Sequence, residues 1–387
     1  MTDRTIRLSM REHLRHQVIQ KVVSGGLTEK EAAERLRLST RQIRRLKKRV
    51  MERGPSGVLH RLRGRESNRR LDPALEREIV RLYDEEYRGW NMTHFAEFLA
   101  REHGIEISRE KARQLLHQHP DRPKRNQRRR HRRWRERRTR RGELVQLDTS
   151  IHDWLGADGE KVVLISAIDD ATSRVLCSEF FASDGTLENL SLVKSVARKH
   201  GIPESLYVDQ ASKFFLLEED LAAARERGEE GLTQFGRVMK HLGIEMIRAR
   251  SPQAKGRIER SFRTFQDRLV KELSRHVITT MDEANKYLRQ VYLPDHNRRF
   301  SHPPAESDSA FVKMQPGTDY NAIFCLRETR VVQNDCTIQY AGTRYQLAAA
   351  GLRSRQRVEL RTWLNGSLHA YWKGQPIALR PIERKAG

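Results

Sequence analysis

Cysteine and long apolar runs are scarce in this chain of 387 residues, and their scarcity excludes several classes of protein. The three cysteines, Cys177, Cys325 and Cys336, are widely separated and form no Cys-x-x-Cys pair. Neither a cysteine zinc site nor a disulfide framework is therefore supported, and a reducing cytoplasm fits. No apolar run reaches the roughly 18 residues that a membrane span needs. The stretch MTDRTIRLSMREHLRHQ lacks the apolar centre of a secretory signal, so we expect a cytoplasmic protein.

Two common enzyme signatures are also absent, whereas positive charge is in large excess. The sequence holds no Walker-type glycine loop and no His-Glu-x-x-His, which excludes the usual ATP-binding and zinc-protease motifs. The formal net charge is +24 and the isoelectric point is about 10.4, far beyond what solubility needs. Such a surplus indicates a polyanionic partner, most simply nucleic acid. The length predicts roughly two to four domains.

Residues 1–53 have the pattern of a helix-turn-helix DNA-binding domain. Thr28 and Glu31 have the spacing of a capping box for one short helix, and Ser39 or Thr40 begins the next. The second helix turns apolar residues inward and is basic on its outer side, which favours DNA binding. A helical hairpin with a solvated charged face is the alternative. The candidate DNA contacts of the second helix are Arg41, Gln42, Arg44, Arg45, Lys47 and Lys48.

Three further segments separate this domain from the centre of the chain. Residues 54–71 are a basic linker with glycine. Residues 72–120 have the periodicity of a second three-helix unit, which we interpret as a second DNA-binding unit; because its third helix is less basic, a unit without DNA contact is the alternative. Residues 121–142 form an Arg-rich linker with thirteen Arg or Lys against two acids, a net charge of +11. Such dense like charge repels itself but binds along DNA phosphates, so DNA contact is favoured over a merely solvated linker. The candidate contacts there are Arg128, Arg129, Arg130, Arg132 and Arg133.

From residue 143 the pattern changes to strands and helices in succession. Residues 143–280 predict the order β-β-β-α-β-α-β-α, which begins with an antiparallel meander and indicates a mixed α/β layer fold. Residues 281–320 are a connector that is first helical and then irregular at its prolines. Residues 321–387 predict a small all-β, barrel-like domain of about five strands, with a two-residue hairpin at Asn365-Gly366.

Three carboxylates of the central domain are candidates for chemistry. Asp148 interrupts the apolar residues of the first strand, Asp209 ends the fourth strand, and Glu259 lies in the first turn of a helix. Glu259 and Arg263 share a helix face that projects away from the core. Carboxylates brought together repel unless a cation joins them, and Mg²⁺ or Mn²⁺ suits oxygen ligands. Taken singly, each has an ordinary alternative as a turn acid or, for Glu259, as a partner of the helix dipole.

Four motifs carry a resemblance to a known family. Together, ELVQLDTS, AIDDATSR, LYVDQASKF and SPQAKGRIERSF resemble the catalytic core of DDE transposases and retroviral-type integrases, which has an RNase H-like fold. Over nearly its whole length the chain is similar to bacterial insertion-sequence transposases of the ISNCY type. The resemblance implies that Asp148, Asp209 and Glu259 bind two Mg²⁺ or Mn²⁺ ions, for cleavage of transposon ends and transfer of the freed 3′-hydroxyl to target DNA. The cations then placed to hold DNA phosphates are Lys255, Arg257 and Arg263.

The resemblance also implies an assembly, and the sequence departs from the family pattern at two points. Two DNA ends must be brought together, which implies a dimer or larger homo-oligomer on DNA, in a bacterial cytoplasm and associated with the nucleoid. Many relatives have Asn-Gly after the second Asp, where this chain has Gln210-Ala211. The stretch from Asp209 to Glu259 is longer than the commonest spacing, which predicts an inserted helix.

Two neighbouring acids and two other functions are the alternatives to this assignment. Asp169 and Asp170 are competing carboxylates, but they precede ATSR at a predicted hairpin turn, so we interpret them as turn residues. A DNA-binding regulator with an inactive RNase H-like core is one alternative function, which the complete Asp-Asp-Glu set disfavours. A metal-dependent DNA nuclease without strand transfer is the other, and the sequence alone does not separate it from a transposase.

Overall fold

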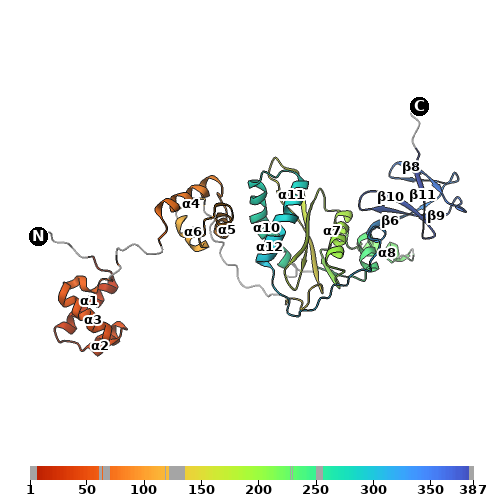
Figure 1. The fold of residues 1–387 in the computed structure, drawn as a ribbon. Helices are drawn as coiled ribbons and strands as arrows, with labels where there is room; N and C mark the ends of the chain where they lie inside the picture. Colours follow the sequence, from red (N-terminus) through yellow and green to blue (C-terminus); the bar gives the residue numbers. More distant parts are fainter. Residues whose placement is uncertain are drawn as a thin grey trace. The chain divides into compact units, whose positions relative to one another are not determined.

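The computed structural model describes residues 7–60, 63, 70–117, 119–121, 136–226, 228, 230–249 and 256–382 (Figure 1). The chain divides into two compact units, Met1–Ile79 and Val80–Gly387, and helix α4 (Pro73–Glu85) spans the boundary between them. No helix among these described residues is long and apolar enough to cross a membrane.

The first unit is a small helical domain around an apolar core. Its helices are α1 (Met10–Val23), α2 (Glu29–Leu36) and α3 (Thr40–Arg53), followed by the short 3-10 helix η1 (Gly54–Val58). Capping boxes begin the α-helices at Ser9, Thr28 and Ser39, which confirms both predicted helix starts. Ile19 and Ile43 are fully buried between the helices, so the inward face predicted for the second helix of the motif is also confirmed.

The predicted linker at residues 54–71 begins later than the sequence indicates. Val58 of η1 is 1% exposed and belongs to the core of the first unit. Gly57 permits this close approach, because a Cβ there would lie 2.5 Å from the carbonyl carbon of Arg49 in α3. Residues 54–58 are therefore part of the helix-turn-helix domain, and the linker starts after them.

The second unit begins with the remaining helices of the predicted three-helix region. α5 (Met92–His103) starts at the N-cap Asn91 and ends at Gly104, whose φ of +65° is the left-handed conformation that favours glycine. α6 (Arg109–Leu115) starts at the N-cap Ser108. The aromatic side chains buried in this part of the second unit are Tyr83, Tyr87, Trp90, Phe95 and Phe98.

The central sheet has five strands in the described part of the chain. They are β1 (Val145–Ile151), β2 (Val163–Asp169), β3 (Val175–Phe181), β4 (Ser205–Val208) and β5 (Glu245–Arg248). The order is β3-β2-β1-β4-β5, in which β2 is antiparallel to both its neighbours and β4 is parallel to both of its own. The first three strands form the predicted meander, and the mixed order confirms the predicted α/β, RNase H-like core.

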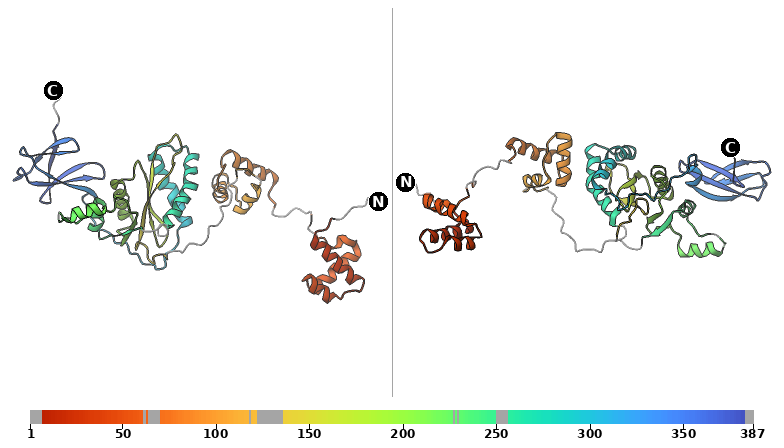
Figure 2. Two further views of the ribbon diagram at one scale, coloured as in Figure 1. Left: turned by 180° about the vertical axis from the view of Figure 1, so that it is seen from behind. Right: turned by 60° about the horizontal axis from the view of Figure 1, so that its bottom comes forward.

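Helices cover both faces of this sheet, with α7 on one side and α10, α11 and α12 on the other (Figure 1, Figure 2). The helices in this part of the chain are α7 (Thr186–Lys199), α8 (Glu218–Glu226), which does not cover the sheet, α9 (Gln234–His241), α10 (Gly256–Arg275), α11 (Met281–Tyr287), the π-helix η2 (Leu288–Tyr292) and α12 (Leu293–Phe300). Because side chains alternate along a strand, Val145 and Leu147 of β1 pack with α7 and α9, whereas Gln146 between them faces α10. α8 is the inserted helix that the sequence predicts between Asp209 and Glu259.

Helix α5 is bonded to the C-terminal half of α10 by polar side chains. Nε2 of His94 lies 2.9 Å from Oε1 of Glu272, and both side chains are buried. Nη1 of Arg268 donates to Glu97 at 2.6 Å. These bonds hold the C-terminal half of α10, away from its first turn. One face of α5 therefore contacts α10. DNA binding by residues 72–120 stays a prediction.

The C-terminal domain is an antiparallel half-barrel of six strands in the described residues, one more than the sequence predicts. After the short helix α13 (Tyr320–Ile323) come β6 (Cys325–Val331), β7 (Thr337–Tyr340), β8 (Thr343–Ala348), β9 (Arg357–Trp363), β10 (Leu368–Trp372) and β11 (Gln375–Pro381). Their order is β6-β9-β10-β11-β8-β7. Where β9 pairs with β10, Leu368 lies opposite Thr362. The turn between the two strands therefore consists of three residues, Leu364, Asn365 and Gly366, and the predicted two-residue turn is wrong.

Candidate active site

Asp148 lies in β1, and Asp209 directly follows the neighbouring parallel strand β4. β1 and β4 pair with Gln146 opposite Tyr207. Continued by two residues, this register sets Asp148 beside Asp209, which directly follows β4. Neighbouring strands are about 4.8 Å apart, so the continued register brings these two residues close together. The carboxyl end of a parallel strand is also where α/β sheets collect functional groups.

Helix α10 lies along the face of β1 that carries Asp148. Near the start of the helix, the N–H of Ile258 donates to Oε1 of Gln146 at 3.3 Å. Further along, Nε2 of Gln266 donates to Oγ of Ser150 at 3.2 Å. Gln146, Asp148 and Ser150 alternate on one face of β1. α10 therefore covers the face on which Asp148 stands.

Glu259 is exposed in the first turn of α10. It precedes Gln266 by seven residues, so the two share one side of the helix, and that side borders β1. Ile258 and Phe262 are buried against the sheet, while Arg263 is exposed. The division of α10 into a packed face and an open face is therefore confirmed.

The candidate metal ligands do not form a closed cluster in the structure. Within the described residues, no three His, Cys, Asp or Glu side chains lie close enough together to hold a metal ion. Asp148 and Asp209 are neighbours, whereas Glu259 stands on the adjacent helix. The donor set suits Mg²⁺ or Mn²⁺, because it consists of carboxylate oxygens and two of the carboxylates are adjacent. Glu259 follows shortly after residues 250–255, which include Lys255 and lie outside the described residues.

The loop after Asp209 is held by local contacts. The N–H of Ala211 donates to Oδ1 of Asp209 at 3.0 Å and closes an Asx turn over Gln210. Lys213, further along the loop, forms an ion pair with Asp184. The Gln210-Ala211 sequence, which departs from the family pattern, thus still gives the Asp209 carboxylate a set orientation.

Asp169 closes the turn between β2 and β3, as predicted. Its carboxylate accepts hydrogen bonds from the N–H of Gly142 at 2.8 Å and the N–H of Thr172 at 2.9 Å. The side chain is fully buried, and this burial raises the pKa of Asp169 despite the hydrogen bonds. Asp169 therefore ties the start of the core domain to the β2–β3 turn.

Asp170 also lies in the β2–β3 turn, as the sequence indicates, but its side chain has partners outside the turn. Asp170 is fully buried, and its Oδ1 accepts hydrogen bonds at 2.7 Å from Nε2 of Gln146 and from Nη1 of Arg257. The side chain of Arg257 is only 13% exposed and is paired with Asp170, so its guanidinium is not available for the predicted contact with DNA. Gln146 was not identified from the sequence as a partner of Asp170. It could have been noticed as a polar residue on the same face of the strand as Asp148.

Three of the predicted DNA contacts on α3 have partners inside the domain, and the weakest is the 4.0 Å ion pair of Lys48 with Glu52. Oε1 of Gln42 accepts the N–H of Ser39 at 3.0 Å and completes the helix cap. Arg44 forms a 2.6 Å ion pair with Glu29 of α2, although its side chain is still 70% exposed. Arg44 is therefore partly neutralised, and Gln42 has a structural role.

The exposed cations of α3 form a basic side of the helix. Arg41, Arg45 and Lys48 are exposed and follow one another at spacings of four and three residues, which places them on one side of α3. Lys47 is half-buried. The predicted contacts of the Arg-rich linker lie outside the described residues: Arg128, Arg129, Arg130, Arg132 and Arg133.

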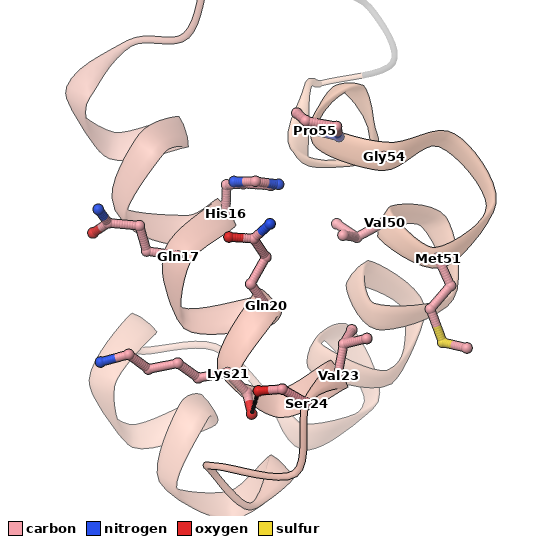
Figure 3. A pocket seen from close by; sticks show the side chains of 10 residues that line it. All are labelled: His16, Gln17, Gln20, Lys21, Val23, Ser24, Val50, Met51, Gly54 and Pro55. Carbon is pink, nitrogen blue, oxygen red and sulfur yellow. Dashed lines mark hydrogen bonds between the residues drawn. The ribbon is translucent and has the colours of Figure 1, made fainter.

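A hollow of about 700 Å³ lies in the first unit between α1, the end of α3 and η1 (Figure 3). His16 lines it and is 9% exposed, and its Nε2 has no hydrogen-bond partner among the described residues. Val50 and Met51, at the C-terminal end of α3, line the opposite side. The hollow is therefore separate from the N-terminal turn of α3, where Arg41 lies.

Sequence relatives identify the family of this chain. It is 35% identical over 98% of its length to "Putative transposase y4bF" of Sinorhizobium fredii, of which it covers 82%. The chain belongs to the family of insertion-sequence transposases. This transposase is also 28% identical, over 87% of its length, to the transposase for insertion sequence IS1202 of Streptococcus pneumoniae, of which it covers 78%. A family model described as winged helix-turn helix matches residues 15–77.

Solved structures give weaker comparisons. A chain of the simian T-cell lymphotropic virus intasome in complex with the PP2A regulatory subunit B56 gamma is 16% identical, with a TM-score of 0.35. That match covers 79% of the transposase and 100% of the viral chain. The HTLV-2 integrase catalytic core domain in complex with magnesium is also 16% identical, with a TM-score of 0.27 over 39% of the transposase and 89% of that domain. These scores are low, so the family assignment rests on the sequence relatives.

Proposed function

We propose that this transposase binds the ends of an insertion sequence, cleaves them and transfers their 3′-hydroxyls to target DNA. Asp148, Asp209 and Glu259 are the catalytic residues in this proposal, and together they hold two Mg²⁺ or Mn²⁺ ions. The observation that carries it is the parallel register of β1 and β4, whose continuation by two residues brings Asp148 opposite Asp209, on the face of β1 against which the start of α10 packs.

The chain's own groups around the carboxylates have separate tasks. The N–H of Ala211 bonds to Oδ1 of Asp209 and so restricts the orientation of this carboxylate. Arg263 lies one helical turn after Glu259 on the open face of α10, where its guanidinium is placed to hold a DNA phosphate. When bound, two divalent ions activate an attacking oxygen and stabilise a leaving oxygen in phosphodiester displacement.

DNA binding is divided among three parts of the chain in this proposal. Arg41, Arg45 and Lys48 of α3 read the end sequence. The Arg-rich linker and Lys255 bind phosphates without sequence choice. Two DNA ends must meet before transfer, so a dimer or larger assembly of this chain acts on DNA, in the cytoplasm at the nucleoid.

Incubation of the full chain with labelled end DNA, Mg²⁺ and a target plasmid tests the proposed function. We expect labelled ends covalently joined to the plasmid, and we expect EDTA to abolish the joining. Cuts without joined products would instead indicate a metal-dependent nuclease. DNA binding without cuts or joined products would indicate a regulator with an inactive core.

Replacement of Arg41 and Arg45 by Ala is expected to weaken binding to end DNA, measured by fluorescence anisotropy. The physical reason is the removal of base contacts worth about 1–3 kcal/mol each. Lys30→Ala with Arg35→Ala is the matched control, because it removes two exposed cations from α2 instead of α3. If both double variants show the same fall in affinity, α3 contributes only general charge and does not read the end sequence.

A further inference from the structure

The buried carboxylate of Asp170 is the centre of a network that joins the central sheet to α10. Its Oδ1 accepts from Nε2 of Gln146 and from Nη1 of Arg257, both at 2.7 Å. Its Oδ2 accepts from the N–H of Arg138 at 3.0 Å. A carboxylate removed from water is costly unless charge and hydrogen bonds compensate it, and Asp170 has both.

Gln146 extends this network to the backbone of α10. Its amide nitrogen donates to Asp170, while its amide oxygen accepts the N–H of Ile258 at 3.3 Å. The first N–H groups of a helix lack partners within the helix, so a side chain from the sheet satisfies one of them here. The first turn of α10 is thus held at two points, the guanidinium of Arg257 and the N–H of Ile258.

We infer that Gln146, Asp170 and Arg257 are positioning residues that set Glu259 against Asp148, an inference that rests on the proposed function. Gln146 stands two residues before Asp148 on the same face of β1, and Arg257 stands two residues before Glu259 in the same helical turn. Carboxylates that approach each other repel, so the start of α10 needs contacts that do not depend on a bound ion. Supporting bonds of this kind orient ligands and set metal affinity.

Two variants separate positioning from simple stabilisation. Gln146→Met keeps the length of the side chain and the Asp170–Arg257 ion pair, but removes both amide hydrogen bonds. The double variant Asp170→Asn with Arg257→Gln removes both charges together, so no unpaired charge is left inside the protein. Tyr287→Phe is the control, because it removes a 2.7 Å hydrogen bond to the buried Glu272 at the other end of α10.

Titration of the full chain with Mn²⁺, followed by electron paramagnetic resonance, measures the effect directly. We expect Gln146→Met and the double variant to weaken Mn²⁺ binding by about 10- to 100-fold, the usual cost of removing a supporting bond behind a metal ligand. The Mg²⁺ concentration for half-maximal cleavage should rise in parallel, while affinity for end DNA stays unchanged. Tyr287→Phe should bind Mn²⁺ as the wild type does.

The outcomes distinguish this inference from the proposed function. Only the positioning role is overturned if Asp148→Asn weakens Mn²⁺ binding while Gln146→Met and the double variant, both folded, bind Mn²⁺ as the wild type does. An equal weakening in Tyr287→Phe also overturns it, because the effect would then follow from general destabilisation. If Asp148→Asn binds Mn²⁺ as tightly as the wild type, the metal site is wrong and the inference fails with it.

Discussion

Asp148→Asn, Asp209→Asn and Glu259→Gln are each expected to abolish cleavage of DNA ends and strand transfer, while the fold and the affinity for DNA stay close to those of the wild type. Each substitution keeps the shape of the side chain and removes one negative charge. Two divalent ions need that charge to stay bound, so the metal site is strongly weakened. Packing changes little, because Asp148 and Asp209 are half-buried and Glu259 is exposed. Gel assays of cleavage and joining, with circular dichroism for the fold, measure both effects.

Asp158→Asn is the matched control for these variants. Asp158 is exposed in the loop between β1 and β2, so the same chemical change there should leave cleavage and joining intact. Asp170→Asn does not serve this purpose, because it would leave Arg257 without its buried partner. Joining by Glu259→Gln in Mg²⁺ would show that the third ligand is another residue. Loss of activity in Asp158→Asn would show that the assay responds to any change of charge.

Local signals were enough to predict helix starts and the faces of strands. Capping residues such as Thr28 and Ser39 mark helix starts because their side chains bond to N–H groups only three residues away. Asp148 is conspicuous in sequence because it breaks an apolar strand. The alternation of that strand also predicts which face of the strand it occupies.

The same local signals could not predict contacts between segments that are distant in the sequence. Asp170 has the local setting of a turn acid, and its burial depends on Arg257, a residue 87 positions later in the chain. The apolar periodicity of α10 predicts which side of the helix packs on the sheet. It does not predict the distance between the first turn of the helix and the sheet. The hairpin at Asn365-Gly366 shows a similar limit, since the pairing of Leu368 with Thr362 sets the turn length.

The Arg-rich linker, predicted at residues 121–142, is expected to supply affinity for DNA without sequence choice through the arginines before residue 136, because Arg137 and Arg140 near its end bond to Ser173 and Glu143 of the core. Replacement of Arg128, Arg129, Arg130, Arg132, Arg133 and Arg135 by Gln removes six of its thirteen cations. For each phosphate that the linker no longer binds, the plot of log affinity against log salt should flatten by roughly 0.9, because fewer counterions are released on binding. If all six arginines bind phosphates, their replacement lowers affinity at low salt by orders of magnitude. Fluorescence anisotropy at several salt concentrations measures the slope.

Replacement of the same six arginines by Lys separates charge from recognition. Lysine keeps the positive charge but lacks the planar fork of arginine, so the salt slope of this variant should stay near that of the wild type. The ratio of affinities for end DNA and random DNA should change little in either variant, since phosphate contacts carry no sequence information. If that ratio falls sharply in the Lys variant, the linker arginines reach base edges in a groove. Sequence recognition would then be shared between the linker and α3.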